Sequence, residues 1–255
     1  MTVVVHFTDV HLGQRLVASE DHASDKMSYE DAQDENEEHL RRILDDVSRL
    51  GLREIVFGGD IGSRSAPSRF FEILDQYGVA PSMVLGNHDT YADVAHRAGI
   101  GRGAVEGKLC SSHDDGIWRL ITLDTSDNSI GACQLAWLAG ELQGASRVAL
   151  FVHHPVLAID TPIDRSGAAL IDRQDLRALL ETAACDVSIF CGHYHMIDEV
   201  REANIRQFAT PAVSYQIVKW ADRVQVDIRT FGYRIVEFEG PDIRTKCVLL
   251  TDSAR

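Results

Sequence analysis

The residues best suited to chemistry are histidines, aspartates and one asparagine that stand in five small clusters. Asp9 and His11 lie two positions apart, so both side chains can leave an extended segment on the same side. Asp60 offers a carboxylate that can bridge two cations. Together the clusters supply nitrogen and oxygen ligands for two metal ions. The candidate ligands are Asp9, His11, Asp60, Asn87, His153, His193 and His195.

The ligand types narrow the choice of metal. A mixed nitrogen and oxygen set without sulfur suits iron, manganese, zinc or cobalt better than copper(I) or an iron–sulfur cluster. It also fits poorly with a Mg²⁺ or Ca²⁺ site made of oxygen alone. The five cysteines are scattered and lack Cys-x-x-Cys spacing, which argues against a thiolate site and a disulfide framework. We therefore expect two divalent metal ions, with iron and manganese ahead of zinc and cobalt.

Such a pair of metal ions predicts a reaction. Two metals held about 3.5 to 4 Å apart can acidify a water molecule, place it in line with phosphorus and stabilise the leaving oxygen. His88 directly follows the candidate ligand Asn87, so it would be free to neutralise charge or to protonate the leaving group. His88 and the bridging Asp60 are the residues expected to act in catalysis. His154, beside His153, could contact the substrate or orient the neighbouring ring. The predicted reaction is hydrolysis of a phosphoester.

Each cluster directly follows a short apolar run rich in Val, Ile and Phe. Runs of this kind are typical of strands buried on both faces. In an open α/β sheet, ligands lie outside the carboxyl ends of the strands, so polar groups after five strands would converge on one crevice. The five runs are residues 3–7, 54–57, 82–85, 148–152 and 186–191.

Between these strands, apolar positions recur every three or four residues, which indicates amphipathic helices. The expected helices are residues 36–50, 68–77, 134–142 and 174–182, with a further strand at 118–123. Strand and helix thus alternate, which is typical of α/β proteins. Residues 205–250 are mainly β, and we expect an antiparallel sheet there that packs on the first one. The predicted fold class is α/β: a two-sheet sandwich flanked by helices, as a single domain of residues 1–255.

Composition limits the partners. The 255 residues are 45% hydrophobic, enough for a substantial core, and acidic residues outnumber basic ones by 39 to 25, for a formal net charge of −14. An acidic surface disfavours nucleic-acid binding, whereas bound cations still allow a phosphate substrate. The chain begins almost at once with a strand and has no apolar stretch near the ~18 residues of a membrane span. We therefore expect a cytoplasmic protein with no nucleic-acid or membrane partner.

One acidic run, residues 19–38, interrupts the first strand-to-helix connection. Charge runs usually only solubilise, so we expect a solvated loop that leads into a helix. The alternative is a lid, because a loop after a ligand-bearing strand is well placed to cover the site. This segment and residues 158–169 would shape the substrate pocket.

The ordered clusters resemble those of the calcineurin-like metallophosphoesterases. They read Asp-x-His, Gly-Asp, Gly-Asn-His-Asp, His-His-Pro and Gly-His-x-His along the chain. More narrowly, the chain resembles the class III cyclic-nucleotide phosphodiesterase and glycerophosphodiesterase branch, and the acidic run is longer than is usual there. The narrower likeness rests on Leu-Asp-Thr-Ser at 123–126, Gln-Leu-Ala-Trp-Leu at 134–138, Ala-Thr-Pro-Ala-Val-Ser-Tyr-Gln at 209–216 and Phe-Gly-Tyr-Arg at 231–234.

The resemblance implies an αββα sandwich and a role for each candidate. The first metal would be held by Asp9, His11, Asp60 and His195, and the second by Asp60, Asn87, His153 and His193. His88 would lie beside the scissile phosphate. The residues expected to contact the substrate are His11, Asn87, His88, His195 and His154.

We expect a small phosphodiester substrate, with 3′,5′-cyclic nucleotides first and glycerophosphodiesters next. A phosphomonoesterase would use the same metal centre. From a different class, the chain could be a non-catalytic scaffold that keeps the fold, but a scaffold has no physical need for His88 and all seven ligands. The resemblance also allows a homodimer.

Overall fold

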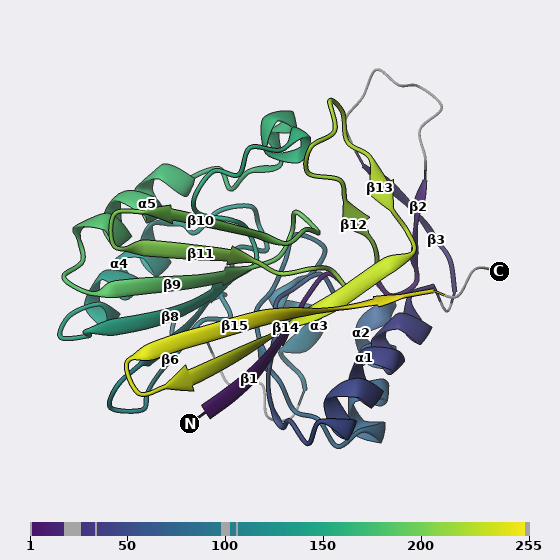
Figure 1. The fold of residues 1–255 in the computed structure, drawn as a ribbon, viewed down its shortest axis with the longest axis horizontal. Helices are drawn as coiled ribbons and strands as arrows, with labels where there is room; N and C mark the ends of the chain where they lie inside the picture. Colours follow the sequence, from purple (N-terminus) through teal and green to yellow (C-terminus); the bar gives the residue numbers. More distant parts are fainter. Residues whose placement is uncertain (1, 18–26, 34, 98–102, 106, 253–255) are drawn as a thin grey trace.

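The computed structural model describes residues 2–17, 27–33, 35–97, 103–105 and 107–252. In these residues two β-sheets pack face to face, and helices cover the outer face of each sheet (Figure 1). The predicted two-sheet αββα sandwich is thereby confirmed.

The first sheet has the strand order β15-β14-β1-β4-β5. Strands β1, β4 and β5 are parallel, whereas β14 and β15 are antiparallel and form the long yellow hairpin of Figure 1. The bounds are β1 (Thr2–Phe7), β4 (Glu54–Phe57), β5 (Ser82–Met83), β14 (Thr230–Glu239) and β15 (Asp242–Thr251).

The second sheet has the strand order β10-β11-β9-β8-β7-β6. Its four central strands are parallel, and the edge strands β10 and β6 are antiparallel to their neighbours. The bounds are β6 (Ser111–Asp114), β7 (Arg119–Leu123), β8 (Arg147–Val152), β9 (Asp186–Cys191), β10 (Asp198–Glu202) and β11 (Ile205–Ala209).

Helices α1 and α2 cover the first sheet, and α4 and α5 cover the second. All four predicted helices are present, within two residues of their expected ends. The longest, α1, has 13 residues, and no described helix is long and apolar enough to span a membrane. The bounds are α1 (Glu37–Arg49), α2 (Ala66–Gln76), α3 (Tyr91–Val94), α4 (Ala132–Glu141) and α5 (Arg173–Thr182), with a short π-helical turn, η1 (Asp164–Ala168).

The alternating direction of side chains along each strand explains why the apolar runs are unbroken. In β1, Val5 and Phe7 pack with the helices, whereas Val4 lies between the sheets with Phe151 and Phe190. Successive side chains of a strand point to opposite faces, so a strand covered on both faces needs apolar residues at nearly every position. This packing fixes where each strand ends, and therefore where the polar clusters begin.

The prediction of a separate antiparallel sheet in residues 205–250 is wrong. Strand β11 pairs in parallel with β9 in the second sheet, and β14 pairs with β1 in the first. Only a small ribbon, β12 (Gln216–Ile217) with β13 (Val226–Asp227), pairs within the segment outside the main sheets. Local apolar pattern identifies a strand but carries no information about its partner, which lies far away in the sequence.

The prediction of a solvated loop is wrong for residues 28–31 of the acidic run, which form a strand. Strand β3 (Ser28–Asp31) pairs with β2 (Gln14–Val17), which gives a two-stranded ribbon before α1. Residues 19–26 and 34 of the run lie outside the described residues. The acidic run places two side chains at the candidate site.

Candidate active site

The five loops that carry the candidate residues meet at one edge of the sandwich. Three follow β1, β4 and β5 of the first sheet, and two follow β8 and β9 of the second. The backbone amide of Asp9 donates to the carbonyl of Gly59 at 2.8 Å, within the first sheet. The amide of His193 donates to the Asp9 carboxylate at 3.0 Å and so joins the two sheets. The predicted crevice exists, but it is built by two sheets rather than by one open sheet.

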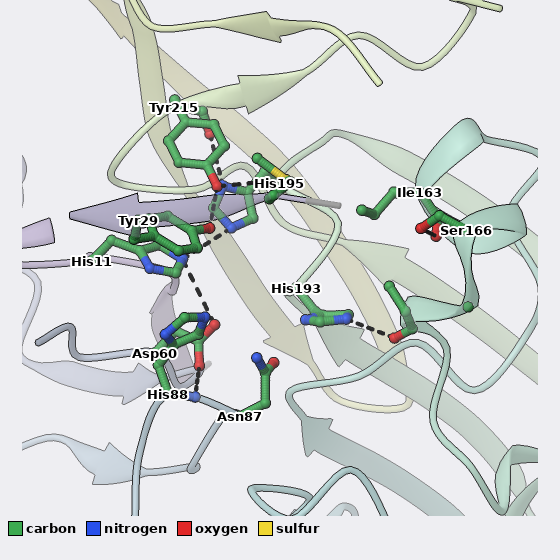
Figure 2. A pocket seen from close by; sticks show the side chains of 13 residues that line it. His11, Tyr29, Asp60, Asn87, His88, Ile163, Ser166, His193, His195 and Tyr215 are labelled. Atoms are coloured by element: carbon green, nitrogen blue, oxygen red, sulfur yellow. Dashed lines mark hydrogen bonds and ion pairs between the residues drawn. The ribbon is translucent and has the colours of Figure 1, made fainter. Parts of the chain in front are cut away.

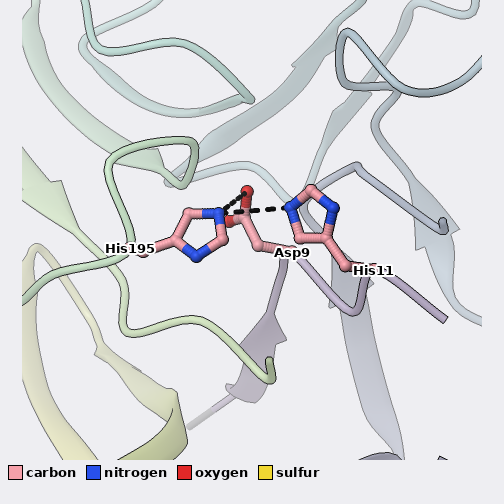
Figure 3. A group of neighbouring side chains, drawn as sticks. All are labelled: Asp9, His11 and His195. Atoms are coloured by element: carbon pink, nitrogen blue, oxygen red, sulfur yellow. Dashed lines mark hydrogen bonds and ion pairs between the residues drawn. The ribbon is translucent and has the colours of Figure 1, made fainter. Parts of the chain in front are cut away.

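Asp9 and Asp60 form the centre of the site, and both are buried. His195 Nε2 lies 3.2 Å from Asp9 Oδ1. His153 Nε2 lies 3.2 Å from Asp60 Oδ2 and 3.8 Å from Asp9 Oδ1. His11 Nε2 lies 3.7 Å from Asp60 Oδ2, and Figure 3 shows this ring beside Asp9 and His195. The two carboxylates therefore share one set of imidazoles.

Four histidines each have one ring nitrogen held by an oxygen acceptor. Such an acceptor takes the N–H of a neutral imidazole, so the other nitrogen can turn its lone pair to the centre. Proteins orient metal-ligating histidines in this way. The pairs are His11 Nδ1 with Gln14 Oε1 (3.0 Å), His153 Nδ1 with the Gly58 carbonyl (2.8 Å), His193 Nε2 with the Ala168 carbonyl (2.8 Å) and His195 Nδ1 with the Tyr215 carbonyl (3.1 Å).

Asn87 Oδ1 is buried and has no hydrogen-bond partner among the described residues, and the buried His153 Nε2 lies 3.2 Å from Asp60 Oδ2 without a hydrogen bond. Leaving such an atom unpartnered costs roughly 1–3 kcal/mol. A cation would accept electron pairs from both atoms and would balance the two carboxylates. The donors therefore fit divalent metal ions. Ligand atoms within 4.8 Å of one another belong to Asp9, His11 and His195, to His11, Asp60 and His88, and to Asp60, His153 and His193.

The backbone at the candidate ligands is strained. Eight described residues other than glycine have a positive φ, and five of them are candidate ligands. This left-handed conformation costs an ordinary residue of order 1–3 kcal/mol and persists only where the surroundings enforce it. The tight folding of the main chain directs several side chains to one point. The five residues are Asp9, His11, Asp60, His193 and His195.

Two glycines let neighbouring loops approach the carboxylates. A Cβ atom at Gly86 would collide with the Asp60 carboxylate, and one at Gly192 would collide with that of Asp9. Each glycine precedes a candidate ligand in its cluster. Glycine is therefore required at these two positions because no side chain would fit there, and not only because it favours turns.

Burial and charge set the protonation of the centre before a cation binds. Burial acts to lower the pKa of His153, but the carboxylates of Asp60 and Asp9 outweigh it and raise the pKa to about 10. Burial lowers the pKa of His11 to about 3 and that of His193 to about 4. At Asp9 and Asp60 the neighbouring imidazoles outweigh burial and hold the pKa below its usual range. The centre therefore keeps two charged carboxylates beside the neutral imidazoles of His11 and His193 and the protonated ring of His153, whose proton a cation would replace.

A cleft of about 270 Å³ opens over the centre (Figure 2). Tyr29 of β3 and Met27, which directly precedes this strand, line one part of it, together with Tyr215. Ile163 and the π-helical turn η1 line another part. The acidic run thus contributes two residues to the wall of the cleft.

Comparison with known proteins decides the family. Residues 2–196 match the model of the calcineurin-like phosphoesterases. The chain belongs to this family. It is 26% identical to a protein of Psychrobacter arcticus named probable cyclic nucleotide phosphodiesterase, over 91% of this chain and 87% of that protein. It is 29% identical to glycerophosphodiester phosphodiesterase GpdQ of Enterobacter lignolyticus, over 68% of each chain. A dimetal phosphatase structure from Danio rerio has the same fold, with a TM-score of 0.68, 13% identity and 99% of both chains covered.

These comparisons establish a metal-dependent phosphoester hydrolase and confirm the resemblance to the phosphodiesterase branch. They do not support the scaffold alternative. The fold places the seven predicted ligands together at one edge of the sandwich. His88 joins them, since its amide donates to Asp60 Oδ1 at 2.9 Å and its ring lines the cleft.

His154 occupies a different position from the other predicted substrate contacts. It is fully buried and is absent from the lining of the cleft. Its ring lies 4.2 Å from that of His193, and its nitrogens bond to Thr125 and Asn128. Of the two roles considered for His154, this geometry favours orienting a neighbouring ring.

Sequence reasoning missed several residues of the site. Asp89 accepts hydrogen bonds from the amides of Asp60, Ile61 and Gly86 at 2.7–2.9 Å, and burial together with the Asp60 charge raises its pKa to about 7. Its place in the Gly-Asn-His-Asp cluster was a usable signal. Tyr29 is the only Phe, Tyr or Trp in residues 19–38, which was another.

Proposed function

We propose that this phosphoesterase hydrolyses small phosphodiesters with two divalent metal ions. The proposal rests chiefly on the buried pair Asp9 and Asp60, which faces imidazoles whose outer nitrogens are held by oxygen acceptors. Two buried carboxylates in contact with one set of ligands require positive charge close by, because an uncompensated buried charge is strongly unfavourable. Cations supply that charge and use the lone pairs that the imidazoles present.

The proposed ligand sets follow from the contacts of Asp60. Its carboxylate lies near His11 on one side and near His153 on the other, as a bridging ligand would. Iron and manganese are the metals we expect, and zinc and cobalt also suit this mixture of nitrogen and oxygen donors. One metal would have the ligands Asp9, His11, Asp60 and His195, and the other Asp60, Asn87, His153 and His193.

Two divalent cations in such a centre acidify a water molecule and stabilise the charge of a phosphate ester. The chain would supply the remaining chemistry. His88 lines the cleft beside Asp60, where it would donate a proton to the leaving oxygen. His11, Asn87 and His195 line the same cleft and would contact the substrate. Tyr29 and Tyr215 also line the cleft and would limit the access of water.

Cyclic nucleotides are the first candidate substrates. The Psychrobacter relative carries that name, and the apolar side chains of Met27, Tyr29 and Ile163 would accept a flat ring beside the phosphate. Glycerophosphodiesters are the second candidate, supported by the Enterobacter relative. A phosphomonoester would use the same metal centre but leave the apolar wall without a partner.

Hydrolysis of bis(p-nitrophenyl) phosphate and of p-nitrophenyl phosphate, with added Mn²⁺ and then with chelator, tests the proposal. We expect chelator-sensitive cleavage that favours the diester. Comparison of cyclic AMP with glycerophosphoethanolamine would then rank the two candidate classes. Preference for the monoester would identify a phosphatase, and no cleavage of any of the four compounds would overturn the proposal.

A further inference from the structure

The short turn η1 joins the wall of the cleft to one of the candidate ligands. Its residues Ser166, Gly167 and Ala168 line the cleft. The carbonyl of Ala168 accepts from His193 Nε2 at 2.8 Å, and Figure 2 shows the ring of His193 with this contact. In the proposed ligand sets, His193 binds the second metal ion and not the first. The position of η1 therefore bears on one metal ion only.

The turn has little regular structure of its own. It is five residues long, and Gly167 inside it departs from helical geometry, with φ 90° and ψ 15°. Ile163 before the turn and Leu170 after it are buried in the apolar core of the second sheet. Apolar packing is non-directional, so it keeps the turn close to the sheet without fixing the direction of a single carbonyl. That direction requires polar contacts.

Asp164, the first residue of η1, makes such contacts. Its Oδ2 accepts from Arg173 Nη1 at 2.8 Å and from the amide of Ile159 at 3.2 Å. Arg173 is the first residue of α5. The exposed fractions of the Arg173 and Asp164 side chains are 16% and 11%, so water screens this ion pair less than a pair on the open surface. One carboxylate oxygen thus ties the turn to the segment before it and to the helix after it.

We propose that Asp164 is a positioning residue for the second metal ion. Its contacts with Arg173 and Ile159 hold η1 so that the carbonyl of Ala168, which lies between Asp164 and Arg173 in the sequence, orients the ring of His193. The other three histidines with a held ring nitrogen have their acceptors outside this segment. Loss of the Asp164 contacts should therefore weaken the binding of the second metal ion and spare the first. This inference rests on the proposed function, which assigns two metal ions to the site.

Calorimetric titration of the metal-free protein with Mn²⁺ tests the inference without a measurement of activity. We expect the wild type to bind two ions, and His193→Ala identifies the binding step that belongs to the second. Removal of a residue that orients a metal ligand typically costs 10- to 100-fold in affinity, so Asp164→Ala should raise the dissociation constant of that step by roughly this factor. The other step should change by less than about twofold, because its ligands do not contact η1. Arg173→Ala, which removes the partner of Asp164, should act in the same direction.

Asp160→Ala is the matched control. Asp160 pairs with Arg165 in the same segment, but both side chains are exposed, and the loss of such a pair should leave both binding steps unchanged. If Asp164→Ala does not fold, Asp164→Asn takes its place. This variant keeps the shape and one acceptor but not the charge, so we expect a loss of at least about threefold at the second step. In a His193→Ala background, Asp164→Ala should leave the remaining step unchanged.

Three results would overturn the role of Asp164 alone. They are an equal loss at both binding steps, an unchanged second step, and a further loss in the His193→Ala background. A wild type that binds fewer than two Mn²⁺ ions would instead overturn the proposed function with two metal ions, and this inference with it.

Discussion

The ring of Tyr29 lies flat against the ring of His11, with 4.8 Å between centroids and 11° between planes. The rings of Tyr29 and His88 form a T-shaped pair with 5.1 Å between centroids. The hydroxyl of Tyr29 hydrogen-bonds to that of Tyr215. A residue from the acidic run thus contacts both a candidate ligand and the candidate acid. This contact couples the wall of the cleft to the metal centre.

Replacement of Tyr29 tests that coupling. An aromatic pair of this kind is worth about 0.5–1.5 kcal/mol, so Tyr29→Leu should raise KM for bis(p-nitrophenyl) phosphate by roughly three- to tenfold. Tyr29→Phe keeps the stacked ring and loses only the hydroxyl, so its KM should stay within about twofold of the wild type. Steady-state kinetics of the three proteins gives the answer. Equal KM values for the Leu and Phe variants would show that stacking is not the important contact.

Replacement of Asp60 and replacement of His88 should have different effects on metal content and activity. Asp60 contacts histidines from both sheets, so Asp60→Ala should abolish activity and lower the metal content at both positions. His88→Ala should cut turnover by roughly 10²- to 10⁴-fold while both metals stay bound, since we assign it to proton transfer. Elemental analysis after gel filtration, together with turnover, separates the two. Equal metal loss in both variants would contradict the assignment of Asp60 to metal binding and of His88 to proton transfer.

The glycines beside the carboxylates make a third test. Gly192→Ala inserts a methyl group against Asp9, and the resulting overpacking should cost about 1–3 kcal/mol of unfolding free energy and reduce metal content. Gly140→Ala is the matched control, because Gly140 lies in helix α4 with open space around it. That change should raise the free energy of unfolding by about 0.5–1 kcal/mol. Urea unfolding of the metal-loaded variants measures both effects.

Metal affinity should increase with pH. In the metal-free protein the pKa of His153 is raised to about 10, so at neutral pH a cation must displace a proton from this ring. Deprotonation becomes easier as the pH rises, and the association constant for Mn²⁺ should grow by up to about tenfold per unit between roughly pH 6.5 and 8.5. His11 and His193 are already neutral in this range and release no proton. Metal titrations at several pH values, with an indicator dye for released protons, check this, and an affinity independent of pH would rule it out.

The sequence predicts the parts of this molecule that depend on local pattern. The apolar runs and their terminal clusters identify the strands that bear ligands, and the spacing of Leu40, Ile43, Leu44 and Val47 identifies α1. Sheet membership is not predictable in this way, since β11 and β14 pair with strands that are distant in the sequence.

The residues of the site that the sequence did not reveal were missed for one common reason. Ala168 contributes a backbone carbonyl, which every residue type possesses, so no residue type could have indicated it. The contact of Gln14 with His88 likewise joins two residues that are 74 positions apart in the sequence. Contacts that arise from the packing of two distant loops leave no trace in the spacing of either loop.

The division of the ligand loops between two sheets gives the proposed metal ions a mechanical effect. Between the sheets, the core is held by apolar packing, which is non-directional and tolerates small sliding movements. Coordination bonds fix distance and angle. Cations shared by Asp9 and Asp60 of one layer and His153, His193 and His195 of the other would act as cross-links that lock the layers in register at this edge. Activity and the rigidity of the sandwich would then be gained and lost together.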